Sequence, residues 1–384
     1  MEKVYYIGSY GTETERGAGR YFPDSAVLKM NGIIEELKES GYRVEIISLS
    51  QSHGGRVKGR YNRISNDVSL KTFTSFGRRN ELVHLLDNVC IRVQSFFYLI
   101  KTVKKGDVVI FYHSYAYILL PRVIKWLKKF KLILELEEIY GDVFGDSKLS
   151  SKEISLADKA DGYIFPTYLL DKKINKEKKP SVVIHGTYKP EKKVVGDEAG
   201  AGSADEKIHI VYAGTLDCRK GSIEAVKATE FLPSGYHIHI LGSGSQKEIE
   251  DLEKEIEKTK GLGADVTYDG RLFGEDYIKF LQKCQLGLCT QDPEAAFTST
   301  SFPSKILSYL SNGLRVLSIK IEAIYKSDVA PLLYFYDEQT PEKIAEAIKS
   351  IDFSKDYDSR GFLDVLFKKS AEQVGKLIDN VRMD

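Results

Sequence analysis

Two loops in the C-terminal half of the chain combine cations with the start of a helix. The first runs from Gly214 to Gly221 and includes Thr215, Arg219 and Lys220, between an apolar run and a helical segment. Backbone amides at a helix N-terminus, together with nearby cations, attract phosphate oxygens. The loop therefore favours a site for a diphosphate, with an ordinary polar turn as the alternative.

The second loop, residues 298–308, is rich in hydroxyl groups. Phe302 and a proline precede a helix whose first turn carries Ser304 and Lys305, and Ser308 lies one turn further on. Free amides at this helix N-terminus and the lysine could hold further phosphate oxygens. The alternative is a capped helix with a surface lysine.

Weaker candidates follow two other apolar runs. Gly242 belongs to a Gly-Ser-Gly segment of the kind that tight turns use freely. Arg271 and Leu272 lie in the turn 269–274, whose backbone groups could hydrogen-bond to the edge of a base. If the preceding runs are parallel strands, all these loops follow the carboxyl ends of the strands, where such sheets bind ligands.

The elements that must position these loops alternate between short apolar runs and amphipathic segments. This alternation predicts parallel strands covered by helices on both faces of a sheet. In the C-terminal half we expect strands at 208–213, 237–241, 266–269, 285–289, 315–318 and 333–335, with helices at 222–231, 246–260, 277–283 and 305–311.

The N-terminal half follows the same alternation, so the fold class is α/β with two doubly wound, Rossmann-like parallel-sheet domains. A chain of 384 residues is long enough for two cores. We expect a first domain at 1–190, a linker rich in glycine and charge at 191–206, a second domain at 207–355 and a final helix at 356–384. Within the first domain we expect strands at 3–7, 44–49, 107–112, 132–136 and 162–166, a helix at 25–40, and loops at 8–22 and 51–63.

Candidate catalytic groups follow two strands of the N-terminal half. His113 comes directly after the strand 107–112, and Glu137 and Glu138 come after the strand 132–136. Histidine and carboxylate side chains at such positions can orient substrate hydroxyls or exchange a proton with an acceptor. A structural histidine and solvated surface acids are the alternatives.

The net charge of +1 hides an asymmetry, because residues 1–190 carry +9 and residues 191–384 carry −8. The segment 117–132 is basic and has a helical apolar period, so it could lie on an anionic membrane surface or simply cover the sheet. Neither a signal peptide nor an apolar run of spanning length is apparent. We expect a cytoplasmic protein, either soluble or peripheral on the inner face of the cell membrane, with reduced cysteines and no nucleic-acid partner.

Taken in order, the C-terminal motifs resemble the nucleotide-binding half of GT-B glycosyltransferases of the bacterial, glycogen-synthase-like type. The resemblance covers residues 205–350 well and 1–190 more loosely. The motifs that carry it are Val211-Tyr-Ala-Gly214, Arg219-Lys-Gly221, Ile238-His-Ile-Leu-Gly242, Val266-Thr-Tyr-Asp-Gly270 and Phe302-Pro-Ser-Lys305 with the helix that leads to Gly313.

The resemblance implies two domains that face a cleft, and transfer of a sugar from a nucleoside-diphosphate sugar, with UDP favoured and retention of configuration. The acceptor would be a glycan or a lipid-linked glycan in cell-surface polysaccharide synthesis. Lys220 corresponds to the lysine that neutralises the diphosphate, and the glycine-rich loop with Gly19 to one that touches the donor phosphate or the acceptor. Thr215 replaces an arginine of many relatives, and Thr300 and Ser308 replace a pair of glutamates.

The same resemblance leaves other functions open. A sugar-nucleotide 2-epimerase can use this fold, and so can a sugar-binding partner subunit that lacks catalysis. We identify no Asp-x-Asp motif and no histidine cluster that would hold a metal ion, so no metal or other cofactor is expected. In this interpretation lysines and helix N-termini stabilise the leaving diphosphate.

Overall fold

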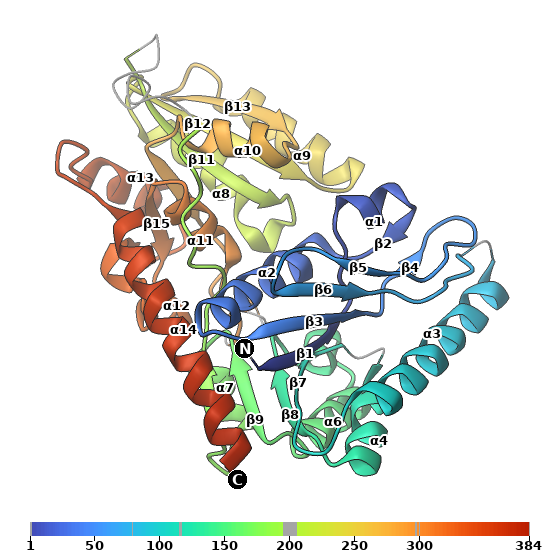
Figure 1. Ribbon diagram of the computed structural model, residues 1–384. Coiled ribbons are helices and arrows are strands. Elements are labelled where there is room, and N and C mark those ends of the chain that lie inside the picture. The colour runs from blue at the N-terminus through green and yellow to red at the C-terminus, as the bar shows by residue number, and fades with distance from the viewer. Residues whose placement is uncertain are drawn as a thin grey trace. The chain divides into compact units, whose positions relative to one another are not determined.

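The chain divides into two compact units in the computed structural model, which describes residues 2–78, 80–114, 117–194, 206–295, 298 and 300–383 (Figure 1). Unit 1 comprises Met1–Thr187 and Phe367–Asp384, and unit 2 comprises Tyr188–Leu366. Most of the segment expected as a linker, 195–205, lies outside the described residues. The last helix, α14 (Ser359–Met383), begins in unit 2, and its residues from Phe367 onward belong to unit 1.

Unit 1 is built on a sheet with the strand order β10-β9-β8-β7-β1-β3-β6-β5 among the described residues. Each pair of neighbours is parallel except β5 and β6, which are antiparallel. The central strands are buried along almost their whole length, as expected for a sheet covered on both faces. The strands are β1 (Lys3–Gly8), β3 (Arg43–Ser48), β5 (Tyr61–Arg63), β6 (Val68–Lys71), β7 (Val108–Tyr112), β8 (Lys131–Glu135), β9 (Gly162–Phe165) and β10 (Ser181–Val183).

Helices cover both faces of this sheet, with α2 on one face and α4 and α6 on the other (Figure 1). The part of α14 from Phe367 onward also packs on this unit, where Ser370 Oγ donates to Glu36 Oε1 at 2.7 Å. The helices of unit 1 are α1 (Glu13–Gly17), α2 (Asp24–Glu39), α3 (Glu81–Thr102), α4 (Leu119–Lys128), α5 (Tyr140–Phe144), α6 (Ser147–Ala157) and α7 (Tyr168–Ile174).

Two segments expected as loops are more ordered than the sequence suggested. The segment 8–22 contains α1 and β2 (Arg20–Tyr21), and 51–63 contains β4 (Gln51–Ser52), which pairs with β2, and β5. The buried guanidinium of Arg20 connects them, because it donates to the carbonyls of Ser50 at 3.0 Å and Lys58 at 3.1 Å. Gly19 precedes this pairing with φ +87°, in the left-handed region that favours glycine.

The basic helix expected over 117–132 is also shorter than predicted. Helix α4 ends at Lys128, because Lys129 adopts the left-handed conformation with φ 52°, and β8 begins at Lys131. Across the described ranges, no helix has the length and apolar character needed to cross a bilayer.

Unit 2 contains a parallel sheet with the strand order β13-β12-β11-β14-β15-β16 in the part that the structure describes. Each expected strand of this half is present, and the prediction of an α/β chain with parallel sheets is confirmed. The strands are β11 (Ile208–Thr215), β12 (Tyr236–Ser243), β13 (Asp265–Gly270), β14 (Leu286–Cys289), β15 (Arg315–Ile319) and β16 (Leu333–Tyr336), and the helices are α8 (Ser222–Lys227), α9 (Gln246–Thr259), α10 (Gly274–Leu281), α11 (Ser304–Ser311), α12 (Glu322–Tyr325) and α13 (Pro341–Ser350).

Tyr309 fixes α11 to the centre of this sheet. Its ring covers Gly287, where a Cβ atom would lie 2.3 Å from the ring, so β14 needs a glycine at this point. Its buried hydroxyl accepts a hydrogen bond from the Ala213 amide at 2.7 Å and donates to the Leu288 carbonyl at 3.3 Å. A single side chain therefore connects α11 to β11 and β14.

We expect Tyr309→Phe to destabilise unit 2 by about 1–3 kcal/mol, because it leaves a buried amide without its acceptor. Tyr325→Phe is the matched control, since that ring is 38% exposed. Urea unfolding of the full chain measures both, and equal midpoints for the two variants would contradict the role assigned to Tyr309.

Candidate functional site

The loop after β11 receives a cation from α11. Lys305 is the second residue of α11, and its Nζ lies 3.7 Å from the centre of the Tyr212 ring. A Cβ atom built on Gly214 would lie 3.3 Å from the same nitrogen. Nζ is buried, and among the described residues no atom accepts a hydrogen bond from it. A charged donor is thus held at the carboxyl edge of the sheet with its hydrogen bonds unmade.

The surroundings of this ammonium disfavour its own charge. Burial, with the nearby cation of Lys220 as a smaller cause, lowers the pKa of Lys305 from 10.5 to about 8. A desolvated cation close to another cation is stabilised by an anion that contacts both. The pair Lys220 and Lys305 therefore has the electrostatics of a phosphate site.

The glycines of these loops allow close packing of the strand ends. A Cβ atom on Gly242 would lie 1.7 Å from the Gly214 carbonyl oxygen, and one on Gly221 would lie 1.6 Å from the Thr290 carbonyl oxygen. Both glycines also have positive φ, +148° and +80°. In this structure their role is to let neighbouring backbones approach, which no other residue type permits at these positions.

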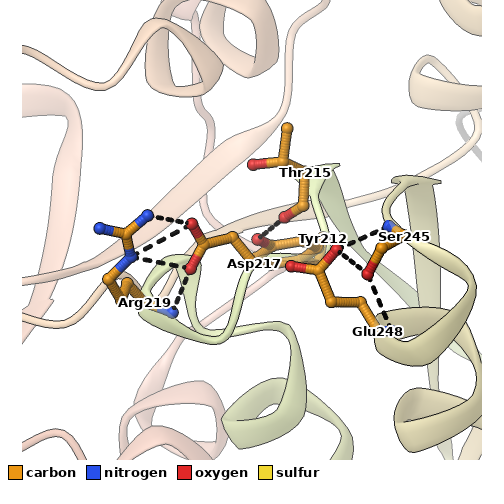
Figure 2. Close-up of polar contacts among 6 residues, drawn as sticks. All are labelled: Tyr212, Thr215, Asp217, Arg219, Ser245 and Glu248. Carbon is orange, nitrogen blue, oxygen red and sulfur yellow. Dashed lines mark hydrogen bonds and ion pairs between the residues drawn. The ribbon is translucent and has the colours of Figure 1, made fainter.

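Arg219 already has a partner, as Figure 2 shows. Its Nε donates to Asp217 Oδ1 at 3.0 Å, and this arginine lowers the pKa of Asp217 to about 2. The adjacent Thr215 is exposed, and its carbonyl accepts a hydrogen bond from the Tyr212 hydroxyl at 2.9 Å. Arg219 is therefore engaged with a carboxylate in the same turn, unlike the buried ammonium of Lys305.

The turn after β12 is a helix cap. Ser245 and Glu248 form a capping box at the start of α9, in which the Ser245 amide donates to Glu248 at 2.6 Å (Figure 2). These side chains satisfy each other's backbone amides. Gly242 and its neighbours thus have a structural explanation that needs no ligand.

The remaining donor candidates lie in two places. Arg271 is exposed, and its guanidinium lies 4.3 Å from the Phe273 ring, with Leu272 half-buried between them in sequence.

In the loop before α11, Phe302 is buried and Ser304 is exposed at the first helical residue. Ser308 Oγ lies 3.1 Å from the Tyr277 hydroxyl, so this replacement for a family glutamate forms a contact between α11 and α10. The structure therefore brings Lys305 close to Gly214 and Lys220, whereas among the described residues Arg271, Ser304 and Ser308 show no such contact with this loop.

Unit 1 contains a cavity of about 710 Å³ near the carboxyl ends of β1, β3 and β7. Its walls include Gly8, Tyr112, His113, Tyr117 and Tyr140. The position agrees with the rule that parallel sheets bind ligands at the carboxyl ends of their strands.

His113 is held rigidly at this cavity. Its Nε2 lies 2.6 Å from Glu153 Oε1, and its ring stacks on Tyr140 with centres 5.8 Å apart. Glu153 also accepts hydrogen bonds from the amides of Tyr140 at 3.1 Å and Gly141 at 2.8 Å. Because the carboxylate acts as an acceptor, Nε2 is the donor in this contact, and in a neutral imidazole Nδ1 is then the remaining acceptor. Within the described part of the chain, the buried Nδ1 has no hydrogen-bond partner.

Glu153 was not anticipated from the sequence. It lies in α6, 40 positions after His113, and nothing in its local pattern distinguishes it from other acids of an amphipathic helix. Complete burial of both side chains was the missing signal, and it arises only when α6 packs on the sheet.

The acids expected to be catalytic lie beside another group of charges. Glu137 pairs with Lys29 of α2, with 3.2 Å between Oε1 and Nζ. Glu135, one pleat earlier, is buried against Tyr6, and burial followed by repulsion from Glu137 raises its pKa. Glu138 is half-buried. Neither Glu137 nor Glu138 is among the described residues that line the cavity at His113.

The expectation that the chain has no histidine cluster is wrong. His209 of β11 and His237 and His239 of β12 each offer a nitrogen within 4.8 Å of the other two. His209 and His237 are 28 positions apart in the sequence, and the parallel pairing of their strands brings them together.

Comparison with known proteins gives a result at the level of the fold. No protein-family model matches the sequence, and no curated protein sequence matches it significantly. A trehalose-6-phosphate structure from E. coli, bound with UDP-2-fluoro glucose, superposes with a TM-score of 0.66 at 10% identity and covers 100% of this chain and 99% of that chain.

Two further structures give similar values. Sucrose-phosphate synthase from Thermosynechococcus elongatus has a TM-score of 0.63 at 13% identity, over 100% of this chain and 97% of that chain. HepE of Anabaena, in complex with UDP, has a TM-score of 0.63 at 11% identity, over 98% of each chain. The protein therefore has the GT-B fold that the sequence motifs indicated.

Proposed function

We propose that the protein is a glycosyltransferase whose unit 2 binds a nucleoside-diphosphate sugar, with a UDP-sugar favoured. The observation that carries this proposal is the buried ammonium of Lys305, which lies at the carboxyl end of β11 with Lys220 nearby. Such a site suits the diphosphate of the donor. The UDP and UDP-2-fluoro glucose in two structures of the same fold support the choice of nucleotide.

The two lysines would act mainly when the donor bond breaks. Negative charge then grows on the departing diphosphate, and cations that are already in position stabilise it without rearrangement. In this proposal no divalent ion is required at the diphosphate. The family resemblance favours retention of configuration, and a trehalose-6-phosphate synthase studied for glycosyltransfer with retention shares the fold at 11% identity.

The cavity of unit 1 would bind sugar groups of the acceptor. Nδ1 of His113 faces no protein partner among the described residues, while Glu153 fixes the opposite nitrogen. A buried acceptor of this kind gains a hydrogen bond from a sugar hydroxyl without losing one to the protein. We infer a glycan or lipid-linked glycan acceptor, as in the synthesis of cell-surface polysaccharides.

The surface of α3 and α4 supports a lipid-linked acceptor at an anionic membrane. Both helices expose apolar side chains at helical spacing, so neither stripe is used by the core. Beside them a hollow of about 910 Å³ is lined partly by Arg92, Arg122 and Lys152. The exposed apolar residues are Leu82, Leu85, Leu86, Val89, Val93 and Phe97 of α3 and Leu119, Val123, Trp126 and Leu127 of α4.

Not every cation of this region is available to a membrane. Lys125 pairs with Asp161, and Lys128 donates to the Ile100 carbonyl at 2.8 Å. Arg122 and Lys129 are exposed. Apolar contact with the lipid therefore contributes more to this proposal than the basic composition of the segment 117–132 suggested.

For nucleotide binding we expect Lys305→Met to weaken the affinity for UDP by about 1–3 kcal/mol, or roughly 5- to 150-fold, because a charge-assisted contact is lost. Lys349→Met, at an exposed position of α13, is the control. Isothermal titration in EDTA and in Mg²⁺ measures both effects. Equal affinities of wild type and Lys305→Met for UDP, GDP and dTDP would overturn the diphosphate assignment, and binding only with Mg²⁺ would overturn its metal independence.

The same variant should stabilise the nucleotide-free protein. The pKa of Lys305 in the folded protein, about 8, lies below its ordinary value of 10.5. At pH 7 burial of the charged side chain therefore lowers the free energy of unfolding. This cost disappears as the pH rises from about 8 to 10.5, because the unfolded chain then also loses the proton. The free energy of unfolding of Lys305→Met should therefore exceed that of wild type by about 1–3 kcal/mol at pH 7 and by less at pH 10. Urea unfolding at both pH values measures this, and a constant difference would show that packing alone is responsible.

For membrane binding we expect the wild type to sediment with vesicles that contain phosphatidylglycerol and much less with neutral vesicles. The double variant Leu119→Gln and Trp126→Gln should lose this binding, whereas Leu262→Gln and Phe273→Gln, also at exposed positions but in unit 2, should not. Raised ionic strength should weaken binding by screening Arg122 and Lys129. No binding by wild type, or self-association through this face in sedimentation velocity, would contradict the membrane proposal.

A further inference from the structure

The three histidines of unit 2 lie on one face of its sheet. His209 is in β11 and is paired in register with His237 of β12, and His239 follows two residues later. Side chains two positions apart in a strand point to the same face. One nitrogen of each ring lies within 4.8 Å of the others, and the ring centres of His237 and His239 are 4.0 Å apart. Three imidazoles from two strands therefore converge.

A hydrogen bond already links two of these rings. His209 Nδ1 and His239 Nε2 are 2.9 Å apart, so one nitrogen carries a hydrogen and the other accepts it. A metal ion could replace that hydrogen and take both nitrogens as ligands. All three residues are half-buried, so an ion can reach them from solvent.

Asp269 of β13 supplies a carboxylate, the group that commonly hydrogen-bonds to the far ring nitrogen of a metal-binding histidine. Its Oδ2 lies 3.0 Å from His239 Nδ1 and also accepts a hydrogen bond from Thr267 Oγ1 at 2.9 Å. A carboxylate that accepts a hydrogen bond from the far nitrogen of an imidazole fixes the ring and makes the opposite nitrogen a better ligand. With Nδ1 directed at Asp269, Nε2 of His239 is the nitrogen that faces His209.

We propose that His209, His237 and His239 bind a divalent transition-metal ion, with Zn²⁺ or Ni²⁺ as the best fit, and that Asp269 orients His239. Imidazole ligands favour these ions over Mg²⁺ or Ca²⁺. The ion would join β11 to β12, next to the strand β13 at the edge of the sheet.

This site is separate from the proposed diphosphate site. His209 precedes Gly214 by five residues of β11, which is roughly 16 Å along an extended strand. Lys305 approaches the carboxyl end of that strand, whereas the histidines lie near its amino end. The metal would therefore stabilise unit 2 and would not contact the leaving group, so this inference stands independently of the glycosyltransferase proposal.

The test uses the full chain without a histidine tag, dialysed against a chelator and titrated with ZnCl₂ or NiCl₂ in competition with a chromophoric chelator. We expect one bound equivalent, and a melting temperature that rises with metal concentration. His209→Gln and His237→Gln should each weaken binding at least tenfold. Asp269→Asn retains all three ligands, so it should weaken binding by about 10- to 100-fold without abolishing it.

His53→Gln, an exposed histidine of unit 1, is the matched control and should bind metal like wild type. Circular dichroism and UDP titration of each variant separate loss of the site from loss of the fold. The proposal is overturned if wild type binds no more metal than the double variant His209→Gln and His237→Gln. It is also overturned if His53→Gln reduces binding as much as the cluster variants do.

Discussion

A buried ammonium without a protein counter-ion among the described residues is the constraint on which unit 2 depends. Taking the Lys305 charge out of water is costly, and its lowered pKa reports that cost. Packing holds it in place nevertheless, because Tyr309, one turn further along α11, is bonded to the Ala213 amide and covers Gly287. The fold thus keeps a cation in a position where, among the described residues, no atom accepts a hydrogen bond from it.

Close approach of backbone at the strand ends makes this position possible. Gly242 lies against the Gly214 carbonyl and Gly221 against the Thr290 carbonyl, with no room for a Cβ atom. The ends of β11 and β12 are therefore drawn together, and Lys305 reaches Gly214 where a side chain would crowd it. Glycines that resemble ligand contacts in a motif here allow neighbouring backbones to approach each other.

In unit 1 the buried polar groups are paired with each other. His113 and Glu153 are both almost completely buried, and each has its orientation determined by the other and by the amides that follow β8. Glu153 occupies one ring nitrogen of His113, and the other, Nδ1, has no hydrogen-bond partner among the described residues. The exposed apolar stripes of α3 and α4 lie on the same unit as this pair.

Local pattern in the sequence was sufficient for the strands of unit 2, since a strand buried on both faces is a continuous apolar run that ends at turn residues. It also located the loops at Gly214 and Lys305, because a cation before a helix is a local signal. Short elements such as β5 escaped prediction, since their order comes from contacts such as those of Arg20 with distant carbonyls. Only the tertiary structure decided that Lys305 is buried against Gly214, that Glu153 holds His113, and that His209 meets His239. Each of these depends on which strands and helices become neighbours, and burial and pairing between distant residues leave no trace in local periodicity.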